Sequence, residues 1–111
     1  MLKELTERYI KVFGEKDLNS VSLLFDDDFV LEDPIVKRVE GKSKSLEIVK
    51  NIFNSCDKLS FSAKNIYMED DITIIEFVLV LDKQRLEGVD IIKWENEKMK
   101  ELRAYLDIPK G

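Results

Sequence analysis

Apolar residues recur at helical spacing in the first half of the chain and at strand spacing in the second half. In the first segment they are Leu2, Leu5, Tyr9, Val12 and Phe13. This pattern predicts an amphipathic helix from Leu2 to about Phe13 that ends at Gly14. Tyr9 lies on its buried stripe.

Two further helices are predicted before Cys56. Asp17 can cap one that carries Leu18, Val21, Leu24 and Phe25, and the acidic run 26–28 then forms a solvated turn. Gly41 and Ser43 introduce the other, with a stripe of Leu46, Val49, Ile52 and Phe53. Between these helices, alternation over 29–33 predicts one short strand, followed by a short charged connection.

Four runs in the second half, 61–69, 72–82, 85–95 and 98–107, are β-branched or alternating and are separated by short polar links. Such links predict hairpins and an antiparallel meander. The whole pattern predicts an α+β domain, with three N-terminal helices packed on one face of a curved, mostly antiparallel sheet. With 111 residues, the chain is expected to form a single domain over 1–111.

Composition argues against several classes of function. The formal charge is −5 and both signs are mixed along the chain, whereas nucleic-acid binding needs a concentrated basic surface. No apolar run has membrane-spanning length and no signal-peptide pattern is present, so the expected location is the cytoplasm. Cys56 is the only cysteine and there is no histidine, which excludes an internal disulfide, a cysteine cluster, histidine metal sites and Ser-His or Cys-His nucleophiles.

Two carboxylates fall on apolar strand faces. In "FVLEDP" (29–34), Asp33 shares a face with Phe29 and Leu31, and in "RLEGVDIIKWE" (85–95), Asp90 shares a face with Leu86, Gly88, Ile92 and Trp94. Burial raises the pKa of an unpaired carboxyl group, so Asp90 could be neutral and donate a hydrogen bond.

Each candidate also has a purely structural interpretation. Asp33 precedes Pro34, where a strand can simply end in a turn. A bulge at Gly88 would shift the register and return Asp90 to solvent. Tyr9 is by itself typical of a core tyrosine whose hydroxyl reaches water.

Three segments carry a resemblance to a known family: "RYIKVFGEKDLNSV" (8–21), "LFDDDFVLEDPIVKRVEGKSKSLEIV" (24–49) and "GVDIIKWENEKMKELRAYLD" (88–107). In order and spacing they resemble the bacterial ketosteroid isomerases and SnoaL-like domain proteins of the nuclear transport factor 2-like superfamily. The resemblance covers most of the chain and is weakest between about Asp57 and Gln84. It implies a cone-shaped α+β barrel of cystatin-like fold, a homodimer and no cofactor or metal.

The resemblance assigns roles to three polar residues. The family's general base, an aspartate before proline, falls on Asp33. Its oxyanion-donating tyrosine, which follows an arginine in the first helix, falls on Tyr9. Its second donor, an aspartate that starts a "D-apolar-apolar-basic-aromatic" strand and stays neutral, falls on Asp90; a neutral carboxylic acid in that role is an established property of ketosteroid isomerases.

The sequence also departs from the family pattern. Phe25 and Val49 stand where further tyrosines support the oxyanion tyrosine, and Leu106 stands where an aromatic residue closes the pocket. Lys37 and Arg38 are expected near the pocket mouth, where a cationic rim would favour an anionic or polar ligand over a neutral steroid.

The predicted function is cofactor-free proton-transfer isomerisation of a small carbonyl compound, catalysed by Asp33, Tyr9 and Asp90 in an apolar pocket. The alternative is a non-catalytic ligand-binding or dimerisation module, because this fold serves many purposes. Dehydratases and polyketide cyclases of the superfamily usually use a histidine, and an epoxide-hydrolase-like site would want an arginine where Gly88 stands. Alternation predicts a pocket lining, each residue of which could equally be ordinary core, formed by Phe29, Leu31, Leu86, Ile92, Trp94, Leu102 and Leu106.

The predicted partners are a small apolar organic ligand, anionic if the cationic rim exists, and a second copy of the chain. The second copy is expected because the opposite sheet face still carries apolar residues, a patch large for a monomer. They are Ile74, Val78, Val80, Val89 and Ile91.

Overall fold

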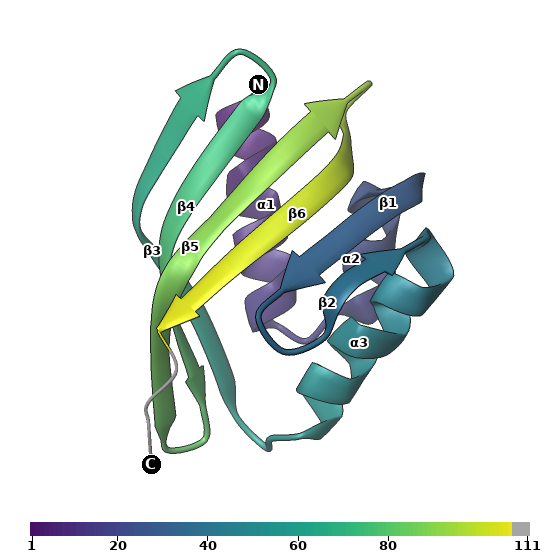
Figure 1. Cartoon of the computed structure of the whole chain (residues 1–111). Helices are drawn as coiled ribbons and strands as arrows, with labels where there is room; N and C mark the ends of the chain where they lie inside the picture. The colour runs from purple at the N-terminus through teal and green to yellow at the C-terminus, as the bar shows by residue number, and fades with distance from the viewer. Residues whose placement is uncertain (108–111) are drawn as a thin grey trace.

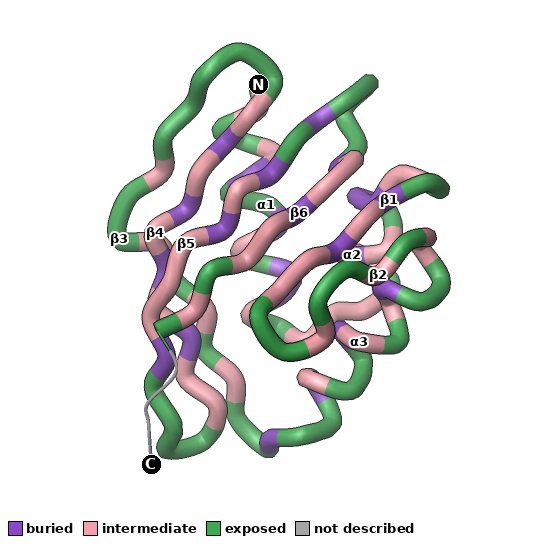
Figure 2. The backbone as a smooth tube through the Cα atoms, in the orientation of Figure 1, coloured by how far each residue is buried: buried purple, intermediate pink, exposed green. Residues whose placement is uncertain are grey.

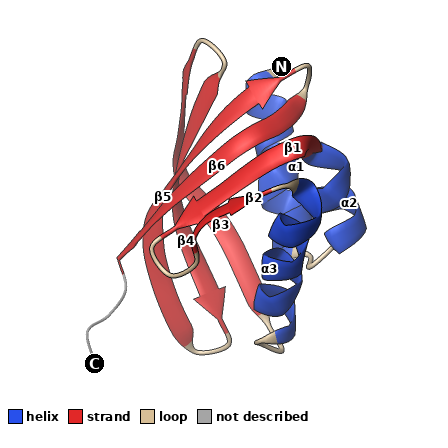
Figure 3. Ribbon diagram, turned by 45° about the vertical axis from the view of Figure 1, so that its right-hand side comes forward, coloured by secondary structure: helices blue, strands red, loops and turns tan. Residues whose placement is uncertain are grey.

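Three helices cover one face of a curved six-stranded sheet, and within the described part of the chain the other face carries no helix (Figures 1 and 3). The computed structural model describes residues 1–107. The strand order is β2-β1-β6-β5-β4-β3, and every neighbouring pair is antiparallel except β1 and β6, which run parallel. The α+β class is therefore confirmed, with a mixed sheet. We call the helix-covered face the inner face and the opposite one the outer face.

The helices follow the predicted apolar stripes. They are α1 (Leu2–Gly14), α2 (Leu18–Leu24) and α3 (Lys42–Asn54). Asp17 caps α2 as predicted, because its carboxylate accepts hydrogen bonds from Ser20 N at 3.1 Å and Ser20 Oγ at 2.7 Å. These bonds stabilise the ionised form and lower the pKa of Asp17.

The second half of the chain forms the predicted meander of β3 (Leu59–Glu69), β4 (Ile72–Leu81), β5 (Gln84–Glu95) and β6 (Lys98–Asp107). The connections are two-residue hairpin turns. At the β5–β6 turn Asn96 and Glu97 both have positive φ, as a hairpin whose twist matches the strands requires. Buried and half-buried residues alternate along β4, as Figure 2 shows, so one side of each strand builds the core.

The region between α2 and α3 differs from the prediction. Phe25 does not end a helix but begins β1 (Phe25–Asp33), and the acidic run 26–28 is part of this strand and not a turn. Lys100 on β6 supports the run, with its Nζ 3.3 Å from Asp26 Oδ1 and 3.7 Å from Asp28 Oδ2. The charged connection after Asp33 contains a further strand, β2 (Lys37–Glu40), which pairs with β1.

A buried polar chain joins α1 to the sheet. Trp94 Nε1 donates to Thr73 Oγ1 at 2.9 Å, Thr73 and Thr6 hydroxyls are 2.9 Å apart, and Thr6 Oγ1 donates to Leu2 O at 2.7 Å. Each hydroxyl has one proton, so Thr73 donates to Thr6 while it accepts from Trp94. All three side chains are buried. This series of hydrogen bonds fixes the depth at which α1 packs on β4 and β5.

The helices of the described residues are too short and too polar to cross a membrane.

Candidate functional site

A chamber of about 80 Å³ lies under the inner face of the sheet, and Tyr9, Asp33 and Asp90 all line it. The three residues come from α1, β1 and β5, so the fold brings together positions far apart in the sequence. The rest of the lining is apolar: Phe13, Phe25, Phe29, Leu31, Val49, Ile52, Phe61, Phe77, Leu79, Leu102, Ala104 and Leu106.

Asp90 reaches the chamber because β5 keeps its register. The pairs Phe77↔Gly88 and Ile75↔Asp90 belong to an unbroken ladder with β4, so the bulge considered at Gly88 does not form. A Cβ at Gly88 would lie 2.3 Å from the backbone oxygen of Tyr105 and 2.9 Å from Phe77 Cζ. Glycine therefore lets β6 and Phe77 approach closely here, and a larger residue does not fit at this position.

The Asp90 carboxyl is buried without a polar partner. It is 5% exposed, and no hydrogen bond connects it to another residue of 1–107. Its oxygens are nevertheless not sealed by protein atoms and border the chamber. Burial disfavours the charged form and raises the pKa of Asp90 to about 8. At neutral pH the group is mainly a protonated acid that can donate a hydrogen bond into the chamber.

Tyr9 presents a second unpartnered polar group to the same space. Its side chain is 4% exposed and its ring packs at centroid distances of 5.7 Å from Phe13 and 6.0 Å from Phe61. Burial, and then the negative charge that Asp90 can carry, raise the pKa of Tyr9 well above its ordinary value. The hydroxyl therefore keeps its proton and makes no hydrogen bond within 1–107, which leaves it free to donate.

Asp33 is the last residue of β1, and its side chain both closes a turn and lines the chamber. Its Oδ1 accepts from Ile35 N at 2.8 Å and from Val36 N at 2.6 Å, the geometry of a turn closed by the aspartate side chain. The half-buried side chain still lines the chamber. Both bonds fall on Oδ1, and Oδ2 makes no hydrogen bond with the described residues.

An outer cleft of about 310 Å³ adjoins the chamber, between α3 and the end of the sheet. Four residues line both spaces and form what we call the neck: Asp33, Ile52, Leu79 and Leu106. The remaining residues of the cleft are Ile35, Val36, Ile48, Asn51, Ser55, Leu81 and Leu86. Asp33 is thus the only one of the three candidate polar residues that borders both spaces.

The predicted lining divides into three groups. Phe29, Leu31, Leu102 and Leu106 line the chamber, and Leu86 lines the outer cleft. Ile92 and Trp94 line neither space, and their prediction as pocket residues is wrong. They lie on the inner face beyond Asp90, where the Trp94–Thr73–Thr6 chain packs β5 against α1 and leaves no space.

Several lining residues were not predicted. Phe61, Phe77 and Leu79 face the chamber from β3 and β4, and the alternation of those strands indicated their face but not their depth. Phe25 and Val49, at which the sequence resemblance implied supporting tyrosines in related proteins, also line the chamber. Its polar lining in the described chain is therefore limited to Tyr9, Asp33 and Asp90.

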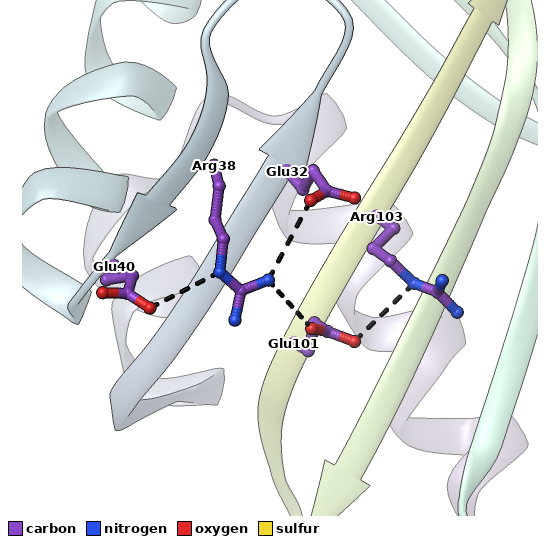
Figure 4. Close-up of polar contacts among 5 residues, drawn as sticks. All are labelled: Glu32, Arg38, Glu40, Glu101 and Arg103. Atoms are coloured by element: carbon purple, nitrogen blue, oxygen red, sulfur yellow. Dashed lines mark hydrogen bonds and ion pairs between the residues drawn. The ribbon is translucent and has the colours of Figure 1, made fainter.

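The expected cationic rim is wrong for Arg38. Figure 4 shows its guanidinium among Glu32, Glu40 and Glu101, with N–O distances of 3.9, 3.4 and 3.6 Å. Arg38 pairs with Glu32 in the β1–β2 ladder and so shares the outer face, one residue out of phase with Asp33. Lys37 is exposed and lines neither the chamber nor the cleft.

Comparison with known proteins agrees with this architecture. The SnoaL-like domain family profile matches residues 6–102, while no curated protein matches the sequence. A proposed ketosteroid isomerase from Kribbella flavida superposes with a TM-score of 0.84 at 14% identity, covering 97% of this chain and 78% of that one.

Two further solved structures share the fold. An LEH-like epoxide hydrolase from M. tuberculosis has a TM-score of 0.78 at 15% identity, covering 94% of this chain and 80% of that one. An uncharacterised cystatin-fold protein from Novosphingobium aromaticivorans has a TM-score of 0.82 at 13% identity, covering 91% and 94%. At these identities the likeness establishes the fold alone.

Replacing Asp90 should change how stability depends on pH. The unfolded chain loses this proton near the ordinary pKa of 3.8, whereas the folded chain keeps it to about 8. Between these values the unfolded state binds fewer protons, so the contribution of Asp90 is fully present below 3.8 and is lost as pH rises to about 8. Asp90→Asn removes this loss and should stabilise the protein by about 2 to 5 kcal/mol at the upper end of the range.

Urea unfolding at several pH values between 4 and 8 measures this difference, with Asp27→Asn as the exposed-carboxylate control. The free energy of unfolding of Asp90→Asn should rise relative to that of the parent as the pH increases across the range. The free energy of unfolding of Asp27→Asn should follow that of the parent. Parallel pH profiles for the parent and Asp90→Asn would contradict a neutral buried Asp90.

Proposed function

We propose that this chain, which belongs to the SnoaL-like domain family of the nuclear transport factor 2-like superfamily, binds a small carbonyl compound and isomerises it by proton transfer. One observation carries the proposal. Two buried hydrogen-bond donors, Tyr9 and Asp90, are unpartnered within 1–107 and border the same small apolar chamber as the Asp33 carboxylate. Buried polar groups are normally paired, and a ligand oxygen would supply the missing partner for both.

In the proposed reaction Asp33 carries the proton, and Tyr9 and Asp90 stabilise the negative charge that develops. The Asp33 carboxylate takes a proton from the carbon next to the carbonyl of an unsaturated ketone, and the C–H electron pair moves into the conjugated system to form a dienolate. The dienolate oxygen accepts hydrogen bonds from Tyr9 and neutral Asp90. Asp33 then returns the same proton to the far carbon of the system, so the double bond moves and no group is consumed.

The charges at the site favour a neutral ligand over an anionic one. Asp33 and Asp90 are both acidic, and neither Lys37 nor Arg38 lines the chamber or the cleft. An anionic ligand would bring its charge beside the Asp33 carboxylate, and no cationic side chain of residues 1–107 lines the chamber or the cleft to offset it. We therefore propose a neutral ligand, whose oxygen becomes negative only during the reaction.

A non-catalytic binding module is the second candidate, and the observation that favours it is that no tyrosine supports Tyr9 in the described lining. The chamber, at about 80 Å³, is well below the few hundred Å³ of typical ligand pockets, which limits the size of the ligand under either function. Epoxide-hydrolase chemistry is less well supported, since Gly88 occupies the position of the arginine and has no room for a side chain.

Three substitutions separate the proposed roles. Asp33→Asn should abolish isomerisation of a small β,γ-unsaturated ketone, because an amide cannot take up and return a proton at neutral pH. Asp90→Asn should retain a substantial part of the rate, because an amide still donates. Tyr9→Phe removes a donor and should lower kcat by about 100- to 1000-fold.

The rates are followed by the absorbance of the conjugated product, with Asp27→Asn as the unaffected acidic control and circular dichroism as the check on folding. Equal losses for Asp33→Asn and Asp90→Asn would refute the division of roles. If the parent isomerises none of a set of β,γ-unsaturated ketones, the binding-module alternative is favoured.

We also propose that two copies of the chain associate through the outer face. The apolar residues Ile74, Val78, Val80, Val89 and Ile91 lie there half-buried, and Tyr67 and Tyr105 are 51% and 52% exposed. The ion pairs around Arg38 flank this patch on β1, β2 and β6 (Figure 4). Charged residues also lie within the patch, because Glu76 shares the face of Ile74 and Val78 on β4 and Glu87 is the β5 partner of Val78; protein interfaces commonly combine apolar and polar surface.

Light scattering at tens of micromolar should give the mass of a dimer for the parent. Val78→Glu adds a further negative charge beside Glu76 and Glu87 in the middle of the patch and should give a monomer of unchanged circular dichroism. Leu23→Glu places the same charge on α2, at a side chain 62% exposed, and should leave the dimer intact. A monomeric parent would exclude the proposal.

A further inference from the structure

The chamber and the outer cleft adjoin each other at the four residues of the neck, and the lining changes character from one space to the other. Tyr9 and Asp90 line the chamber only, Asp33 stands at the neck, and the cleft beyond is lined mainly by aliphatic side chains. A ligand that places its oxygen on Tyr9 and Asp90 therefore has its next carbons beside Asp33 and the rest of its skeleton in the cleft.

The volumes limit the shape of such a ligand. An apolar cavity of about 150 Å³ holds one benzene ring, so a chamber of about 80 Å³ takes the oxygen and only part of a ring. A rigid fused-ring skeleton would have to pass the neck between Ile52, Leu79 and Leu106. The cleft of about 310 Å³ offers most of the space.

Ile35 gives independent support for a function of the cleft. It is 70% exposed, an unusual position for a large aliphatic side chain, and it follows the turn that Asp33 closes through the amides of Ile35 and Val36. The turn that fixes the proposed base therefore also presents an apolar side chain to the cleft. Asn51 and Ser55 are exposed and mark where the cleft meets solvent.

We infer that the ligand is a neutral amphiphile with one small carbonyl or phenol head and a flexible unbranched apolar tail. The oxygen end of the head occupies the chamber, the rest of the head lies at the neck, and the tail runs over Ile35, Ile48 and Leu86 in the cleft. This inference rests on the proposed function, because it assumes that the ligand oxygen binds Tyr9 and Asp90.

The test is a series of 4-n-alkylphenols, from phenol to 4-n-heptylphenol, titrated by calorimetry at a pH below the pKa of about 8 of Asp90. Each added methylene should lower Kd about three- to fourfold while the cleft is filling. The gain should end once the tail reaches solvent at Asn51 and Ser55. 4-n-Butylphenol should bind more tightly than 2-naphthol, a rigid phenol with as many carbon atoms.

Two exposed positions provide matched variants. Ile35→Ser should weaken the binding of the long alkylphenols and leave phenol unchanged, whereas Leu23→Ser, the same kind of loss on α2, should change neither. Asn51→Trp fills the cleft and should flatten the dependence on chain length. Tyr9→Phe should raise Kd by the same factor for phenol and for the long alkylphenols, because the oxygen of each binds in the chamber.

The outcomes separate this inference from the proposed function. Suppose that phenol binds and that Tyr9→Phe weakens its binding, but that longer tails do not lower Kd or that 2-naphthol binds more tightly than 4-n-butylphenol. The tail site is then refuted and the head site stands. A chain-length gain that survives both Ile35→Ser and Asn51→Trp also refutes the tail site. Failure of the whole series to bind refutes both.

Discussion

The rest of the site depends on the burial of the Asp90 carboxyl without a partner in the described chain. A charged carboxylate in that position would be expensive, so the group keeps its proton to about pH 8 and acts as a donor. The same burial raises the pKa of Tyr9 and keeps its hydroxyl protonated, and any negative charge on Asp90 acts in the same direction. An apolar chamber therefore produces two donors from two acids, and neither is consumed by an internal hydrogen bond.

Rigid elements hold the three polar residues in place. The close approach of the Tyr105 backbone to Gly88 fixes β6 against β5 two residues before Asp90. The Trp94–Thr73–Thr6 chain sets the position of α1, and with it Tyr9. The two amide bonds to Asp33 Oδ1 hold the remaining carboxylate at the neck. Sites supported in this way keep their geometry without the ligand.

Local pattern predicted the directions of side chains well, and their depth and long-range partners poorly. Alternation placed Asp33 and Asp90 on the inner face because side-chain direction in a strand depends only on position. It also placed Ile92 and Trp94 there, but where the chamber ends depends on packing against α1. The acidic run 26–28 resembled a turn because its support, Lys100, lies far along the chain. Arg38 is near Asp33 in the sequence, but it pairs with Glu32 and not with Asp33, so its side chain lies on the outer face.

The central claim is that Tyr9 and Asp90 together hold the oxygen of a ligand in the chamber. A crystal structure of the phenol complex, grown at a pH below the pKa of Asp90, tests it most directly. The account predicts the phenol oxygen within hydrogen-bond distance of both the Tyr9 hydroxyl and an Asp90 carboxyl oxygen, with the ring directed toward the neck. A ring bound with its oxygen turned toward solvent, or an empty chamber with phenol bound elsewhere, would contradict the account.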